Sequence, residues 1–199
     1  APLASIQAAI DYTSDSDTVL VSAGTYYENI NFNGKNIALI GEDRETTIID
    51  GGQNGRVVNM ENGEESPILK GFTIQNGNAM GGAGIYIGYG TSPIIENLII
   101  SGNHAIDDGA GIHCSYSSPI LTDIIVTNNF AQVYGGGIFM SDSNLEIKGD
   151  FLDKLKVVIK EFFEGEMKEL IKAEESRVTD LNLCYNQTWF LSQFTLYIP

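Results

Sequence analysis

Residues 92–114 read SPIIENLIISGNHAIDDGAGIHC, and the same pattern occurs one repeat earlier and one repeat later. The earlier copy, residues 66–87, reads SPILKGFTIQNGNAMGGAGIYI, and the later copy, residues 118–140, reads SPILTDIIVTNNFAQVYGGGIFM. The Ser-Pro pairs that open the three copies are 26 residues apart. A fixed period of this length indicates a repeat architecture in which each copy is one supersecondary unit.

Each copy contains two short apolar segments that are typical of β-strands. In the first segment, equivalent apolar positions recur with the period in three sets: Leu69, Ile95 and Leu121; Phe72, Leu98 and Ile124; Ile74, Ile100 and Val126. In the second segment, alternate residues of a strand point to opposite faces. This places Ile85, Ile112 and Ile138 with Ile87, Cys114 and Met140, and it places Tyr86, His113 and Phe139 on the other face.

The residues between the two segments repeat as well. Asn103 and Asn129 occupy one position, and Asn76 and Asn128 occupy the neighbouring one. Asparagines stacked at a bend can hydrogen-bond along the axis and satisfy the backbone of the turn. The LxxLxLxxN pattern of leucine-rich repeats is absent, and helical repeats are longer and need a 3.6-residue period. The sequence therefore favours a parallel β-coil.

Less regular turns of the same coil are expected before residue 66. Four segments read as strands between glycines: DTVLV (17–21), NIALI (36–40), TTIID (46–50) and RVVNM (56–60). Before them, Leu3, Ile6, Ala9 and Ile10 fall on one face of a short helix. We expect this helix to cover the open first turn, because an uncovered strand edge invites pairing with another chain.

A family resemblance supports this interpretation. The segments SIQAAID (5–11), DTVLVSAGTYYENI (17–30), NIALIGE (36–42) and TTIIDG (46–51) resemble the amino-terminal part of pectin-lyase-like β-helix proteins. The NxA and GGxI elements are similar to the repeats of polymorphic outer-membrane and adhesin β-helices. Over roughly residues 6–147, the resemblance implies an all-β fold, a right-handed single-stranded parallel β-helix with an N-terminal capping helix. We assign residues 1–147 to this domain. The fold carries many unrelated activities, so the resemblance does not identify one.

The repeat pattern stops after Ile147, and residues 148–199 are expected to form a helical C-terminal segment. Apolar residues lie near one face of a helix over about 150–175, namely Leu155, Ile159, Phe162, Leu170 and Ile171. We expect this helix to cap the last turn, because solenoids need terminal caps. Two alternatives stay open: self-association through the 150–175 helix, and a segment that is foreign to the β-helix.

The composition excludes several classes of partner. The 199 residues carry a formal net charge of −15, whereas nucleic acids and anionic membrane surfaces need a basic face. No apolar run approaches the ~18 residues that span a bilayer. No leader precedes APLASIQAAI, so we expect that a leader was removed or that the chain begins inside a longer protein. Two cysteines do not make a disulfide framework. We expect no cofactor other than Ca²⁺, which clustered carboxylates suit.

The regular repeats offer few groups for catalysis. Lyases of the superfamily that the chain resembles use Arg or Lys as the base, but neither residue occurs from Gly71 to Ile147. A glycosidase needs two carboxyl groups. Asp107 and Asp108, with His113 nearby, are the candidate catalytic residues, and the two aspartates are also the candidate metal ligands. The stretch IDDGAGIHC resembles the Asp-Asp pair and Gly-His-Gly of polygalacturonases, without their Asn-Thr-Asp and Arg-Ile-Lys. The simpler interpretation is that the aspartates occupy a turn.

Tyr86, His113 and Phe139 are the candidate ligand-binding residues. If they point outward, their rings lie about one interstrand spacing apart, roughly 5 Å, and form a row on which a sugar can stack. Alternatively, they pack across the strands and stabilise the sheet. We expect a secreted or cell-surface, non-catalytic β-helix that binds a glycan or another surface along one face. The first alternative is a polysaccharide hydrolase or lyase acting on a neutral or calcium-bridged substrate, and the second is a purely structural module.

Overall fold

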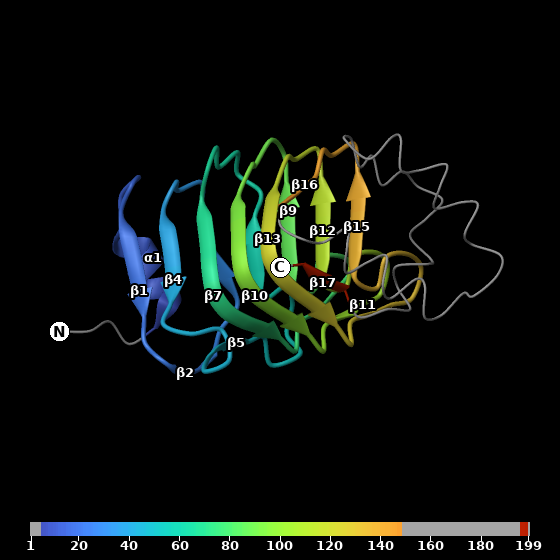
Figure 1. Ribbon diagram of the computed structural model, residues 1–199, viewed down its shortest axis with the longest axis horizontal. Helices are drawn as coiled ribbons and strands as arrows, with labels where there is room; N and C mark the ends of the chain where they lie inside the picture. Colours follow the sequence, from blue (N-terminus) through green and yellow to red (C-terminus); the bar gives the residue numbers. More distant parts are fainter. Residues whose placement is uncertain (1–4, 149–195, 199) are drawn as a thin grey trace.

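A computed structural model describes residues 5–148 and 196–198 and shows a coil of stacked strands with one short helix at its N-terminal end (Figure 1). The helix is α1 (Ile6–Tyr12). The strands of the first two turns are β1 (Thr18–Val21), β2 (Gly24–Tyr27), β3 (Ile30–Asn31), β4 (Ala38–Gly41), β5 (Thr47–Asp50) and β6 (Val58–Met60). The strands that follow are β7 (Ile68–Gln75), β8 (Asn78–Ala79), β9 (Ile85–Gly88), β10 (Ile94–Ser101), β11 (His104–Ala105), β12 (Ile112–Ser115), β13 (Ile120–Thr127), β14 (Phe130–Ala131), β15 (Ile138–Ser141), β16 (Glu146–Lys148) and β17 (Leu196–Ile198).

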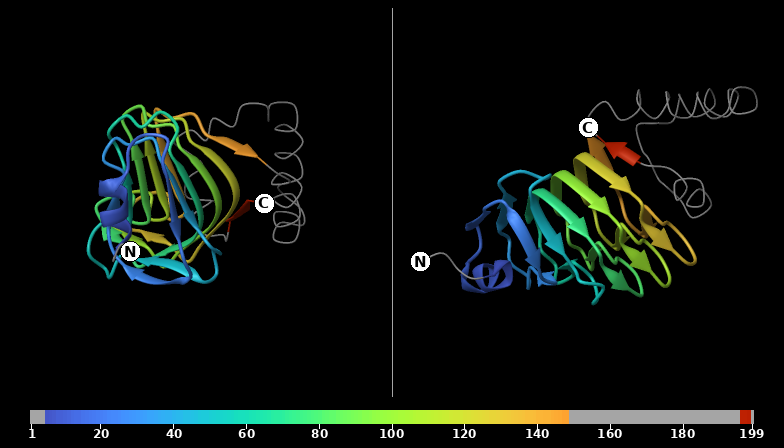
Figure 2. Two further views of the ribbon diagram at one scale, coloured as in Figure 1. Left: turned by 90° about the vertical axis from the view of Figure 1, so that its left-hand side faces the viewer. Right: turned by 90° about the horizontal axis from the view of Figure 1, so that it is seen from below.

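Each regular turn of the coil passes through three sheets in the same order. The chain runs from a long strand of a nine-stranded sheet to a two-residue strand of a three-stranded sheet, and then to a strand of a five-stranded sheet. In this way β7, β8 and β9 form one turn, β10, β11 and β12 the next, and β13, β14 and β15 the third. The sheets wrap around a common interior, as the end-on view in Figure 2 shows. The all-β parallel solenoid expected from the repeat is therefore confirmed.

The strand register has the period of the sequence repeat. Ile94 of β10 pairs with Ile68 of β7 on one side and with Ile120 of β13 on the other, and all these pairings are parallel. Residues 26 apart in the sequence are therefore neighbours along the axis. Their inward side chains form the core, and the three sets predicted from the first segment are at most 1% exposed.

The first two turns have no strand in the three-stranded sheet, and their part of the nine-stranded sheet is also built differently. Both β4 and β5 pair with β7, each with one half of it. The later turns replace the loop between β4 and β5 by one residue in the left-handed backbone region, which is Gly71, Asn97 or Asp123. This loop lies against the later turns, because Thr73 Oγ1 donates to the backbone carbonyl of Arg44, and the Arg44 guanidinium lies 3.3 Å from the Asp123 carboxylate.

The predicted asparagine ladder is present where the long strands end. Asn129 Oδ1 accepts hydrogen bonds from the backbone and the side-chain amide of Asn103. Asn103 Oδ1 in turn accepts from the backbone N–H of Gly77, and its amide donates to the carbonyl of Ile74. Because Asn103 is 1% exposed, these bonds satisfy backbone groups that no water reaches.

The two ends of the coil are covered in different ways. At the start, α1 buries Ile6 and Ile10, and the Glu28 carboxylate accepts hydrogen bonds from the backbone N–H groups of Ile6 and Gln7. This confirms the N-terminal capping helix. At the other end, β17 pairs antiparallel with residues 124–126 of β13, while β16 pairs with residues 120–122.

Strand β17 therefore lies along the part of β13 that β16 leaves open. The apolar, strand-like sequence of residues 181–199 did not predict this pairing. The helix predicted over 150–175 lies outside the described residues. In the part of the chain that the structure describes, no helix has the length and apolar character needed to cross a membrane.

Candidate functional site

The predicted aromatic row lies on the five-stranded sheet. The register places Tyr86, His113 and Phe139 side by side on β9, β12 and β15. The ring centroids of Tyr86 and His113 are 5.1 Å apart, and those of His113 and Phe139 are 4.9 Å apart. Asn59 of β6 continues the row on the N-terminal side. The row and its spacing are as the sequence predicts.

The sequence left two alternatives open for this row, an outward platform or packing across the strands, and the burial of its outer rings favours packing. Tyr86 and Phe139 are each only 8% exposed, because the turns that lead into the strands fold back against the rings. A Cβ atom on Gly82, Gly109 or Gly135 would lie 2.7–2.9 Å from the Cβ atom of the ring residue it faces. These glycines also have φ between +58° and +63°, a conformation that glycine adopts without strain. The row therefore packs across the strands, with the Tyr86 and Phe139 rings buried and His113 partly buried. Its role in binding a ligand stays a prediction.

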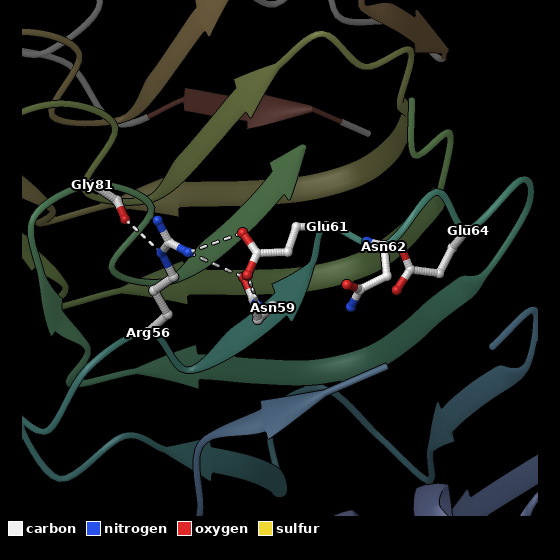
Figure 3. Close-up of polar contacts among 6 residues, drawn as sticks. All are labelled: Arg56, Asn59, Glu61, Asn62, Glu64 and Gly81. Atoms are coloured by element: carbon white, nitrogen blue, oxygen red, sulfur yellow. Dashed lines mark hydrogen bonds and ion pairs between the residues drawn. The ribbon is translucent and has the colours of Figure 1, made fainter. Parts of the chain in front are cut away.

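Arg56 closes the N-terminal end of the row. Its guanidinium carbon lies 3.6 Å from the centroid of the Tyr86 ring, a cation–π contact. Its Nε donates to the carbonyl of Gly81, and its Nη1 lies within 3.3–3.4 Å of the Asn59 amide oxygen and the Glu61 carboxylate. The polar contacts, drawn in Figure 3, hold the guanidinium in one orientation and pair its charge with Glu61.

Of the predicted catalytic residues, Asp107 and Asp108 lie in the turn between β11 and β12, and His113 lies on β12 directly after it. Asp107 is exposed and Asp108 is half-buried. Within the described residues, the buried Oδ1 of Asp108 and the buried Nδ1 of His113 have no hydrogen-bond partner. Gly81 of the preceding turn lies beside this pair, because a Cβ atom at Gly81 would be 3.1 Å from both the Asp108 carbonyl oxygen and His113 Nδ1.

Burial shifts the pKa values of Asp108 and His113 toward their neutral forms. Burial, reinforced by the Asp107 carboxylate, raises the pKa of Asp108 above its ordinary value, against a hydrogen bond from the backbone of Tyr134. Burial also lowers the pKa of His113; the Asp108 backbone and Asp107 oppose this effect, while Arg56 adds to it. A carboxyl group with a raised pKa and an imidazole with a lowered pKa in one region are features that general acid–base catalysis uses.

A metal site has less support than an acid–base pair. Between residues 5 and 148, no three His, Cys, Asp or Glu side chains converge to hold a metal ion. Asp107 and Asp108 would thus be without a third such ligand, and calcium at these residues stays a prediction. Cys114 offers no nucleophile, because complete burial raises the pKa of its thiol to about 12.

Every basic residue before Ile147 is engaged within the protein. Lys35 donates to three backbone carbonyls at the end of α1, those of Ile10, Asp11 and Thr13. Arg44 pairs with Asp123, Arg56 with Glu61, and Lys70 with Glu96. Seventeen acidic residues share this part of the chain with these four cations. A polyanionic ligand would therefore find no free cation on this part of the solenoid.

Two exposed tyrosines stand at the far end of the same strands. Tyr89 follows β9 and Tyr116 follows β12, and the two residues have equivalent places in neighbouring turns because Gly88 pairs with Ser115. They are 67% and 60% exposed, and their φ angles are +53° and +50°. Asp142 takes this place in the third turn, with φ +48°. Sequence reasoning missed these tyrosines, although each directly follows a repeated strand.

No protein family and no curated protein matches this sequence. Among solved structures, the chain is similar to a mutant pectin methylesterase in complex with a hexasaccharide, with a TM-score of 0.38 and 11% identity. The likeness covers 74% of this chain and 63% of the esterase chain, so this chain spans less than two thirds of that protein. The solenoid fold itself rests on the strand pairing. The similarity to adhesin repeats stays a prediction.

Proposed function

We propose that this chain is a non-catalytic β-helix, secreted or displayed at a cell surface. It binds a glycan along the side of the five-stranded sheet at which strands β9 and β12 end. The observation that carries the proposal is the pair Tyr89 and Tyr116. Both rings are about two-thirds exposed, and both backbones have positive φ.

Holding these tyrosines in place opposes stability. A bulky residue with left-handed backbone costs of order 1–3 kcal/mol, and the exposed ring buries little apolar surface in return. Gly and Asn take this conformation more easily. Residues that break a local rule without a structural gain are expected at functional sites. Two aromatic faces about one strand spacing apart, ~4.8 Å, suit the apolar faces of neighbouring sugar units.

The charges define the ligand class. The four cations before residue 147 are paired or buried against carbonyls, and Asp142 lies next along the edge that carries the tyrosines. Because an acidic sugar would be repelled here, the ligand is a neutral glycan or one bridged by calcium.

A glycan array with position-matched variants tests this proposal. Tyr89→Asn and Tyr116→Asn remove the rings while keeping a residue that tolerates positive φ, so binding should fall while stability is unchanged or higher. Tyr12→Ala is the control, since Tyr12 is 86% exposed on α1 at the distant end of the coil. Full binding by both asparagine variants would refute the proposed edge, and loss of binding in the control would show that the effect is not local.

A polysaccharide-degrading enzyme is the second candidate. It is favoured by Asp107 and Asp108 in the turn before β12 and His113 on β12. Two of their buried polar atoms have no partner among the described residues, and the pKa values of Asp108 and His113 move in opposite directions. Release of reducing sugar from neutral polysaccharides would overturn the non-catalytic proposal if Asp108→Asn abolished it and Tyr89→Asn did not.

A further inference from the structure

Six peptide steps in the described solenoid join Asn or Asp to Gly, a pair that reacts spontaneously in water. They are Asn33-Gly34, Asp50-Gly51, Asn54-Gly55, Asn62-Gly63, Asn76-Gly77 and Asp108-Gly109. At an Asn-Gly step, the glycine nitrogen attacks the side-chain carbonyl carbon, a C–N bond forms, and ammonia leaves. The resulting five-membered imide then takes up one water molecule and opens to aspartate or to isoaspartate.

Five of the six glycine nitrogens are held in hydrogen bonds that oppose this attack. The acceptors are the Glu64 carboxylate for Gly34 (3.0 Å), the Gln75 carbonyl for Gly51 (2.9 Å), the Asn78 carbonyl for Gly55 (2.9 Å), the Asn103 side chain for Gly77 (2.8 Å) and the Tyr134 carbonyl for Gly109 (3.1 Å). To react, each of these nitrogens must lose its proton and rotate away from its acceptor, which requires the local structure to open first.

Gly63 is the exception among the described residues. Its backbone N–H makes no hydrogen bond within the part of the chain that the structure describes, and both Gly63 and Asn62 are exposed. A Cβ atom added at Gly63 would find no atom closer than the Tyr89 carbonyl oxygen at 3.9 Å, so no other part of the described chain packs tightly on this glycine.

We infer that Asn62 is a site of spontaneous deamidation in the folded protein. The product adds a carboxylate, and in its isoaspartate form one extra methylene enters the main chain two residues before Glu64. Glu64 is fully buried and accepts hydrogen bonds from the backbone N–H groups of Gly34 and Asn62 and from the Thr91 hydroxyl. The modification therefore distorts the loop at residues 62–64, whose hydrogen bonds link three successive turns of the coil. Figure 3 shows Asn62 and Glu64 in this loop.

Peptide mapping by mass spectrometry after incubation of the full chain at mildly alkaline pH tests this inference. Asn62 should deamidate first, about tenfold faster than Asn33, Asn54 or Asn76, the factor expected when one ordinary hydrogen bond must break. Asn62→Gln should remove the first-appearing product.

The same chain unfolded in guanidinium chloride provides the control, because it keeps every Asn-Gly sequence and removes every hydrogen bond. The four asparagines should then deamidate at similar rates. The inference is overturned if Asn33, Asn54 or Asn76 keeps pace with Asn62 in the folded chain. It is also overturned if the preference for Asn62 persists after unfolding, since the local sequence would then be its cause.

Discussion

Replacing His113 by Phe tests how the aromatic row contributes to stability. The His113 ring is held between Tyr86 and Phe139. Its buried Nδ1 makes no hydrogen bond of good geometry among the described residues, and the Asp108 backbone near it offsets the effect of burial only in part. Removing a buried unpaired polar atom recovers about 1–3 kcal/mol, and fitting the larger ring beside Gly81 costs about 1 kcal/mol. We expect His113→Phe to raise the free energy of unfolding by about 1 kcal/mol at neutral pH.

The same substitution should change the dependence of stability on pH. The pKa of His113 in the folded chain is below its ordinary 6.5, so the unfolded chain takes up the proton first as the pH falls. The wild-type chain should be most stable above pH 6.5 and lose stability as the pH falls through this value. His113→Phe removes this loss, so the difference between variant and wild type should grow toward acid.

Urea unfolding followed by circular dichroism, at neutral pH and at mildly acidic pH, measures both effects. His113→Tyr is a matched variant, because it fills the same place with a ring that carries a polar group. A His113→Phe chain that is less stable than wild type at both pH values would refute the reasoning. It would show that His113 Nδ1 has a partner in solution, such as a bound water.

Three further substitutions test other parts of the solenoid, each by chemical denaturation followed by circular dichroism. Asn103→Ala should cost about 3 kcal/mol, because it leaves buried groups such as the Gly77 N–H unpaired; an unchanged midpoint would contradict the role of the ladder. Gly84→Ala should cost about 2–4 kcal/mol, because the new Cβ atom would lie 2.5 Å from the Gly111 carbonyl oxygen; a neutral effect would mean that neighbouring turns separate easily. Burial alone would raise the pKa of Asp50, but hydrogen bonds from two side-chain amides and one backbone N–H lower it below 3.8. The stability it confers is present above pH 3.8 and lost as the pH falls through its folded pKa, and Asp50→Asn should flatten this acid limb; an acid limb as steep as that of wild type would rule out this role.

Much of the fold could be predicted because the period of the sequence repeat fixes the register in which the strands of neighbouring turns pair. In a parallel coil, residues one period apart must become neighbours, so the alignment of Ile68, Ile94 and Ile120 in sequence is also their pairing in space. The same argument predicted the ladder of Asn103 and Asn129, since each side chain needs only the equivalent residue of the next turn. Where the sequence leaves the 26-residue period, the strand pairing could not be predicted. The antiparallel strand β17 has no counterpart in any repeat.

The candidate site was less predictable, because periodicity says which residues are neighbours and not what covers them. The row of Tyr86, His113 and Phe139 was correct in register and spacing, but the period left open whether its rings are exposed, and Tyr86 and Phe139 are buried. The turns that cover the rings contain Gly82, Gly109 and Gly135, whose positive φ brings the backbone against the rings. The sequence repeat does not predict this backbone conformation.

The exposed tyrosines show the same division. The sequence by itself determined the stacking of the turns, the composition of the core, and the lack of basic residues from Gly71 to Ile147. Only the tertiary structure decided that Tyr86 is buried while Tyr89, three residues later, is exposed with φ +53°. The physical reason is that the repeat encodes contacts between equivalent residues of neighbouring turns. The exposure of a side chain depends instead on how each turn bends and on which other residues of the coil pack against it.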